Sequence, residues 1–190
     1  LLLAKVYIAN KDFKKANSII DELISKHPEN PNSFNQKAIL NFEMLASSSD
    51  PHRLMKETYT FLHTALSLEG DNFESKRLLI KNLLWLGKFD SAEKEKYLEA
   101  KKYGQELLVD FPNDPYLQYI AGYINHKLNQ GEESADNYLK LLELQELNEL
   151  GRFSAENYAI AKLNENHTLR VNLGKYRLER FRFTKKEFLY

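Results

Sequence analysis

The sequence predicts an all-α protein, organised as an α-solenoid of antiparallel helix hairpins with about ten helices. Three observations lead to this prediction. Apolar residues recur at intervals of three and four, as in Ile19, Ile20, Leu23 and Ile24, which is the spacing of one helix face. Most prolines directly follow Asn or Asp. Helix-closing junctions recur every 42 residues, a period typical of solenoids, at Pro28-Glu29-Asn30, Gly70-Asp71-Asn72 and Pro112-Asn113-Asp114.

The Asx-Pro pairs predict helix starts at Pro31, Pro51 and Pro115. An Asx side chain can accept a hydrogen bond from an amide of the first turn, and proline has no amide to leave unpaired there. Turn residues then divide the chain into paired helices. The predicted helices are 1–10, 12–26, 31–46, 51–68, 72–86, 89–110, 115–129, 132–149, 154–164 and 167–183. For residues 167–190 the alternative is a β-hairpin over 169–183, turning at Gly174-Lys175.

These pairs form a single repeat domain over residues 1–190. Because the first helix starts late within its repeat and the last segment is similar to an incomplete unit, we expect the chain to be a fragment of a longer protein. The approximate units are 1–30, 31–72, 73–114, 115–153 and 154–190.

The first unit resembles a tetratricopeptide repeat (TPR). It carries Leu3-Ala4-x-x-Tyr7, Lys11-Asp12-Phe13 at the turn, Ala16-x-x-x-Ile20 and a closing Pro28. Small residues let the two helices approach closely, an aromatic side chain fills the gap beside them, and proline stops the second helix. Later units match less closely, through Phe34, Ala38, Leu62, Ala65 and Gly70, then Leu83, Trp85-Leu86-Gly87-Lys88-Phe89, Ala92 and Pro112, then Ala121-Gly122, Ala135, Leu139 and Leu142.

The resemblance covers about three quarters of the chain and implies a right-handed superhelix. Two units carry extra residues. One set lies around Ser47-Ser48-Ser49-Asp50, and the other lies inside 93–100, where we expect two additional turns of helix. The period also falls in the range of HEAT repeats, which is the alternative repeat family.

Composition excludes several classes of protein. Lys and Arg number 27 and Asp and Glu 27, so no net charge attracts nucleic acid. A hydrophobic fraction of 43% without an apolar run long enough for a bilayer predicts a soluble folded chain with no transmembrane segment. The chain has no cysteine, which fits a bacterial cytoplasm and a periplasm equally well. Abundant Lys and Asn favour a bacterial source.

No pattern in the sequence predicts catalysis, a metal or a cofactor. The chain has no His-Glu-x-x-His, no phosphate-binding glycine loop and no Gly-x-Ser-x-Gly. Its histidines are far apart and share no ligand spacing, at His27, His52, His63, His126 and His167. We therefore expect a protein that is not an enzyme.

In TPR proteins the first helix of each pair lines a concave groove. By position, the resemblance places a basic and aromatic strip there, which would suit an acidic or carboxylate-ended peptide with an apolar anchor. The partner-binding candidates are Asn35, Ile39, Phe42, Arg77, Lys81, Leu84, Tyr119, Tyr123 and His126. The alternative is that Arg77 and Lys81 are ordinary solvated charges and the tyrosines pack between repeats. The carboxylate clamp of some TPR cochaperones does not match, because Lys5, Ile39, Glu74 and Leu78 stand at its positions.

Two segments near the C-terminus carry opposite charge. Residues 132–156 have a net charge of about −5, and 167–190 one of about +5 with five interspersed aromatic residues. The second segment could contact an acidic partner or an anionic membrane surface. Alternatively, the two segments neutralise each other within the fold.

The sequence therefore predicts a protein interaction scaffold that binds a peptide or partner helix in the groove of a TPR array. The alternative is a regulatory or substrate-presenting segment of a larger enzyme whose catalytic domain lies outside this chain. A third hypothesis is self-association through terminal repeats, because the Leu1 to Leu3 end presents apolar residues with no cap.

Overall fold

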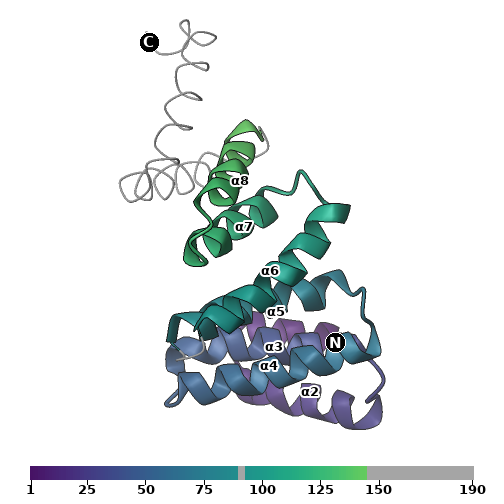
Figure 1. Ribbon diagram of the computed structural model, residues 1–190. Helices are drawn as coiled ribbons and strands as arrows, with labels where there is room; N and C mark the ends of the chain where they lie inside the picture. Colours follow the sequence, from purple (N-terminus) through teal and green to yellow (C-terminus); the bar gives the residue numbers. More distant parts are fainter. Residues whose placement is uncertain (90–92, 145–190) are drawn as a thin grey trace, which may run out of the picture. The chain divides into compact units, whose positions relative to one another are not determined.

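The computed structural model describes residues 1–89 and 93–144, and these residues form eight α-helices and one short 3-10 helix, with no strand among them (Figure 1). This confirms the predicted all-α class, and the architecture is that of a helical-repeat-like protein. The predicted helices 154–164 and 167–183, and the alternative hairpin, lie outside the described residues. The elements are α1 (Leu2–Ala9), α2 (Phe13–Lys26), α3 (Pro31–Met44), η1 (Leu45–Ser47), α4 (Pro51–Leu68), α5 (Phe73–Phe89), α6 (Glu93–Asp110), α7 (Pro115–Lys127) and α8 (Gly131–Glu143).

The predicted starts of α3, α4 and α7 are confirmed. The side chains of Asn30, Asp50 and Asp114 each cap the helix that follows, and proline holds the first helical position. The capping oxygens accept backbone N–H groups at 3.0 Å in all three cases. These bonds satisfy amides that have no partner within the helix.

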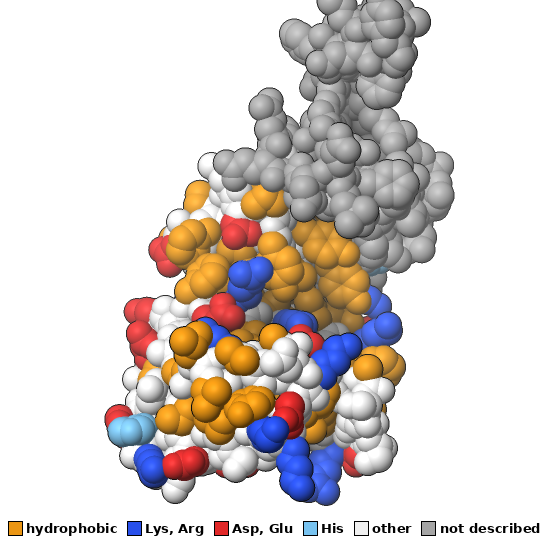
Figure 2. All heavy atoms as spheres, turned by 180° about the vertical axis from the view of Figure 1, so that it is seen from behind, with side chains coloured by type: hydrophobic (Ala, Val, Ile, Leu, Met, Phe, Trp, Pro, Cys, Tyr) orange, Lys and Arg blue, Asp and Glu red, His pale blue; other side chains and the backbone are white. Residues whose placement is uncertain are grey.

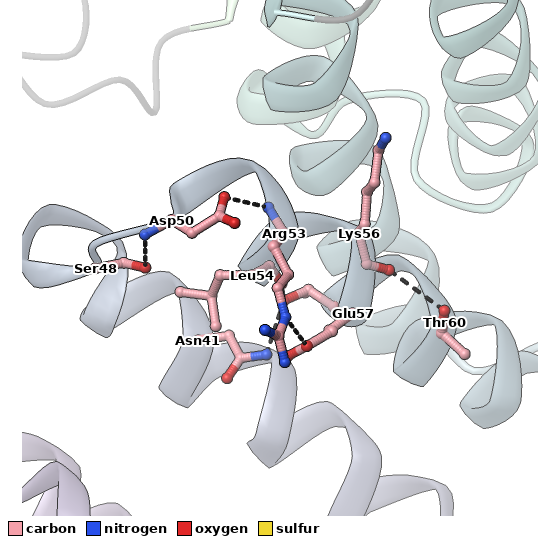
Figure 3. Close-up of polar contacts among 9 residues, drawn as sticks. Asn41, Ser48, Asp50, Arg53, Leu54, Lys56, Glu57 and Thr60 are labelled. Carbon is pink, nitrogen blue, oxygen red and sulfur yellow. Dashed lines mark hydrogen bonds and ion pairs between the residues drawn. The ribbon is translucent and has the colours of Figure 1, made fainter.

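The serine-rich loop before α4 has a local structural role (Figure 3). Ser47 Oγ donates to the carbonyl of Met44 at 3.0 Å, where α3 gives way to η1, and Ser48 Oγ accepts the Asp50 amide at 3.2 Å. One turn into α4, Arg53 Nε lies 2.9 Å from Glu57 Oε1. The extra residues of this unit therefore end one helix and begin the next.

The predicted break between residues 86 and 89 is wrong, because α5 continues to Phe89. The predicted helix bounds leave Gly87 between two helices, but it lies within α5, where Tyr97 of α6 approaches it. A Cβ at Gly87 would lie 3.2 Å from the ring carbon Cζ of Tyr97. Glycine at this position allows the ring of Tyr97 to pack close to the backbone of α5, and it does not form a turn. Residues 93–100 form the first turns of α6, as predicted, and α8 ends at Glu143 rather than at 149.

The chain forms two compact units, Leu1–Tyr103 and Gly104–Tyr190, with α6 contributing to both. In the first unit α1 packs on α2 and α3 on α4, while α2 and α4 also pack on the helix that follows each of them. The odd-numbered helices touch as well, α1 with α3 and α3 with α5. The described part of the second unit is the hairpin of α7 and α8.

Three of the residues that carry the repeat resemblance of residues 1–30 lie in the core of the first unit. Ala4, Ala16 and Ile20 are fully buried, and they form one cluster with Leu40 of α3. The partly buried Tyr7 and Phe13 pack against this cluster. Because the two alanines are small, α1 and α2 approach each other closely, and Leu40 of α3 packs against both helices in this cluster.

The turns between α1 and α2 and between α7 and α8 are alike. Lys11 and Asn129 adopt the left-handed conformation, with φ of 58° and 59°. In each turn the left-handed residue donates to the carbonyl three positions back, and the next residue donates to the carbonyl five positions back, at distances of 2.8 to 3.0 Å. This pair of bonds is the Schellman motif, which satisfies carbonyls at a helix end.

Candidate functional site

Two of the predicted partner-binding residues meet on the surface formed by α3 and α5. Lys81 of α5 is exposed, and its Nζ lies 4.2 Å from the ring centroid of the half-buried Phe42 of α3. This is the geometry of a cation–π contact. Arg77 is exposed one turn earlier on the same face of α5. We call this surface the α3–α5 strip, and it consists of Ile39, Phe42, Arg77, Lys81 and Leu84.

The matching helix starts bring these side chains into register. Asn72 caps α5 by accepting the Ser75 amide at 2.8 Å, and Asn30, 42 residues earlier, caps α3 by accepting the Asn32 amide at 3.0 Å. When two helices begin at equivalent residues, the side chains that follow at the same spacing occupy corresponding places along the two helices. As a result Phe42 and Leu84, which are also 42 residues apart, are both half-buried beside the exposed charges.

Asn35 does not belong to the exposed part of the strip. It is buried, its Nδ2 donates to Asn72 Oδ1 at 3.4 Å, and its Oδ1 accepts the Ser75 hydroxyl at 2.9 Å. Asn35 therefore fixes the start of α5 against α3. The sequence places Asn35 in the groove by its position alone. No sequence pattern indicates that Asn35 will form a hydrogen bond with Asn72, the capping residue of a helix that begins 37 residues later.

Tyr119, Tyr123 and His126 lie on α7, within the second unit, and all three are half-buried. The ring of Tyr119 lies 6.4 Å from that of Tyr138 of α8, and burial together with nearby Tyr123 raises the pKa of Tyr119. Lys127 Nζ lies 5.9 Å from the ring centroid of Tyr123. These residues form their own aromatic surface, which we describe separately from the α3–α5 strip.

A polar cluster that the sequence did not reveal joins α4 to α6. His63 Nε2 lies 2.9 Å from Glu99 Oε1, and the Tyr59 hydroxyl donates to the same carboxylate at 3.2 Å. Lys96 Nζ lies 4.4 Å from the Tyr59 ring centroid. Burial, followed by the charge of Glu99, raises the pKa of Tyr59 to about 12. Tyr59 and His63 are four residues apart on one helix, but nothing in the sequence pairs them with Glu99.

The described residues show neither a cluster that could hold a metal ion nor a helix that could cross a membrane. Within residues 1–89 and 93–144 no group of three His, Asp or Glu side chains could hold a metal ion. In the same part of the chain, no helix combines the length and apolar character needed to cross a bilayer. The Trp85 side chain is half-buried, and its ring centroid lies 4.7 Å from that of Phe89 and 6.1 Å from that of His52. The basic aromatic segment 167–190 lies outside the described residues, as do residues 145–156 of the acidic segment.

No model of a known protein family matches this sequence, and no curated protein matches it either.

Proposed function

We propose that this chain is a non-catalytic interaction scaffold whose α3–α5 strip binds an acidic peptide carrying one apolar side chain. The observation that carries the proposal is the contact of Lys81 with Phe42, which unites a cation and an aromatic ring from two helices at one surface. Arg77 adds a second exposed cation one turn away. An acidic partner fits because charge-assisted hydrogen bonds are stronger than neutral ones.

The helix contacts support the finer proposal that the array is a TPR-like solenoid. The helix α3 packs on its own second helix α4, on the preceding second helix α2 and on the neighbouring first helices α1 and α5. This is the contact pattern of stacked hairpins. The shared Schellman turns at Lys11 and Asn129 support repetition of one hairpin design. In such an array the first helices line one surface, which is where the strip lies.

The strip offers both parts of a peptide site. Ile39, Phe42 and Leu84 supply half-buried apolar area, and Lys81 is already held over Phe42. Binding then orders fewer free side chains, and this lowers its entropic cost. A carboxylate near Lys81 would keep the cation–π contact and add an ion pair at the edge of the ring.

The test is an array of synthetic peptides that each carry one Phe or Leu among acidic residues, with a second set in which Lys replaces the acids. We expect the native protein to bind the acidic set. Lys81→Glu should weaken the best binder at least tenfold, which corresponds to about 1.4 kcal/mol, while the charge-matched control Lys14→Glu should not. Lys14 is exposed on α2, away from the strip.

Phe42→Leu tests the aromatic part separately. It keeps apolar volume but removes the ring under Lys81, so we expect a smaller loss of affinity than Lys81→Glu causes. Equal binding of the acidic and basic sets, or equal loss in Lys81→Glu and Lys14→Glu, would refute the proposal. Circular dichroism of every variant confirms that the helices are intact.

A further inference from the structure

The outer side of α5 carries a regular line of cations. Within α5, all of which the structure describes, the exposed side chains are those of Glu74, Arg77, Lys81, Lys88 and Phe89. Hydrophobic side chains also reach the surface, in groups separated by charged residues (Figure 2). Neither charged nor apolar exposure alone therefore identifies an interface. What distinguishes the three basic residues of α5 is their spacing along the helix.

This spacing alternates between four and three residues, at Arg77, Lys81, Leu84 and Lys88. With 3.6 residues per turn, these positions stay within a stripe about 60° wide, so Lys88 lies on the same side of α5 as the α3–α5 strip and extends it. Along the helix axis the successive cations are separated by about 6 Å and about 10.5 Å. Alternating intervals of three and four residues are those by which one α-helix contacts another that lies along it.

The helix α3 runs beside this stripe in the same direction as α5. Asn35 accepts the Ser75 hydroxyl near the start of both helices, and Phe42 meets Lys81 about two turns later. On α3 the exposed charged side chain among the described residues is Glu43, which is acidic, whereas Phe42 is apolar and half-buried. The surface is thus basic along α5 and without exposed cations along α3.

We propose that the partner bound by the α3–α5 strip is an acidic α-helix, which lies along α5 with carboxylates facing the three cations and an apolar side chain facing α3. This inference rests on the proposed function and names the conformation of the ligand. A helix has the same rise per residue as α5, so carboxylates at i, i+4 and i+11 reach all three cations from one face. An extended chain rises about 3.3 Å per residue and would need acids at i, i+2 and i+5, of which the last points to the opposite side.

The first experiment measures the affinity of the native chain for three synthetic peptides with Glu and one Leu in an alanine-rich background. One peptide has Glu at i, i+4 and i+11 and is made in both sequence orders, because a bound helix can run in either direction. The second has the same composition with Glu at i, i+2 and i+5. The third repeats the first with two alanines of the opposite face replaced by proline, which prevents a continuous helix. We expect the first to bind roughly tenfold more tightly than either of the others.

A variant of Lys88 tests whether the contact runs the length of the stripe. Lys88→Glu should weaken the helical peptide roughly tenfold and leave a shortened peptide, which ends before the third Glu, unaffected. Lys88→Gln should cause a smaller loss, because it removes a charge without adding repulsion. The matched control Lys14→Glu, at an exposed residue of α2, should change neither affinity. Circular dichroism of each variant confirms that the protein is folded.

The outcomes separate this inference from the proposed function. Equal binding of the first two peptides, or of the proline peptide, would overturn the helical partner while leaving an acidic ligand for the strip. Equal effects of Lys88→Glu and Lys14→Glu would likewise overturn a helix along α5. If no acidic peptide binds the native chain, the proposed function and this inference are both refuted.

Discussion

The hairpins α3–α4 and α7–α8 use equivalent positions in different ways. Ala38 and Gly122 lie two 42-residue intervals apart, and both are buried in the first helix of their hairpin. A Cβ at Gly122 would lie 2.6 Å from a ring carbon of Tyr138, closer than side chains tolerate. In α3 the same position accommodates the methyl group of Ala38 with no exposed surface. The second hairpin thus combines the smallest residue with a buried aromatic ring.

Polar contacts in the two hairpins show a shared feature and a difference. Asn41 donates to Thr58 Oγ1, and its equivalent Asn125 donates to Asn137 Oδ1, both at 2.9 Å. In α7–α8 the network continues, because Asn137 donates to Gln118, whose Nε2 donates to the Pro112 carbonyl at 2.8 Å. One asparagine position links the helices in both hairpins, but the second hairpin depends on more exact geometry. Substitutions in its core should therefore destabilise the second hairpin more than equivalent substitutions destabilise the first.

The largest expected effect is that of Gly122→Ala. The added methyl group must displace the buried ring of Tyr138, and overpacking of this kind costs about 1–3 kcal/mol. Alanine's better helix propensity recovers about 1 kcal/mol at most. We expect a net destabilisation of the second unit, measured by amide hydrogen exchange in α7 and α8. Gly87→Ala is the control, because its Cβ would lie 3.2 Å from Tyr97, and it should be close to neutral.

Tyr138→Leu combined with Gly122→Ala should recover part of the loss, because the smaller side chain makes room for the methyl group. If Gly122→Ala exchanges as slowly as the native chain, the two hairpins do not differ in the way described above.

A loss of about 1 kcal/mol is expected on removing a helix cap in either unit. Asp114→Ala should weaken α7, and Asp50→Ala should weaken α4, since each carboxylate accepts an amide at 3.0 Å. Asparagine at either site should retain most of the stability, because its oxygen can accept the same bond. Chemical denaturation followed by circular dichroism measures the changes. An asparagine variant as unstable as the alanine variant would show that charge rather than capping matters.

Asn82→Leu should stabilise the first unit by about 1 kcal/mol or less. Its Oδ1 is buried without a hydrogen-bond partner, and Leu40 shows that leucine fits the equivalent position in α3. Fluorescence of Trp85, the single tryptophan, reports unfolding of this unit. Asn41→Leu is the opposite control and should destabilise, because it removes the bond to Thr58. A stability loss in Asn82→Leu would mean that the Met55 contact outweighs the unpaired oxygen.

The smallest effect concerns the ionisation of Tyr59. Its pKa of about 12 in the folded chain exceeds the ordinary value of 10.0, so the folded state holds this proton more tightly than the unfolded state. The stability contributed by Tyr59 is therefore complete below pH 10 and declines as pH rises toward 12. Glu99→Gln should lower the pKa of Tyr59, as measured by phenolate absorbance, without restoring 10.0, because burial is the largest cause. An unchanged titration would show that Glu99 has no influence.

The sequence predicted the helix starts well, because capping and proline geometry are local. Asn30-Pro31, Asp50-Pro51 and Asp114-Pro115 each need only a few neighbouring residues to act. The predicted end of α5 is wrong because Gly87 is a residue type that is common in turns. Its reason for being glycine is the packing of Tyr97, ten positions later in the sequence, which lies close to its Cα. Glycine for close approach and glycine for a turn look the same in a sequence.

The candidate site was predictable in part for a similar reason. The repeat resemblance places Phe42 and Lys81 on first helices, and the structure brings their side chains into contact. Asn35 has the same kind of position, but Asn72 and Ser75 bury it through hydrogen bonds that depend on how α3 and α5 pack. The cluster of Tyr59, His63 and Glu99 also depends on packing between distant helices, so no local motif could indicate it.

The two Schellman turns have a consequence for remodelling the chain by genetic duplication or exchange. Lys11 and Asn129 differ chemically, and neither is glycine, yet their turns close with matching hydrogen bonds. The turn shape is thus imposed by the helices on either side rather than by the residue at its apex. Each of the two hairpins contains such a turn between its helices and so carries the geometry of that turn with it. A chain in which α7–α8 replaces α1–α2 would keep the same turn inside its first hairpin, so the surfaces of the helices can change while the turn between them stays constant.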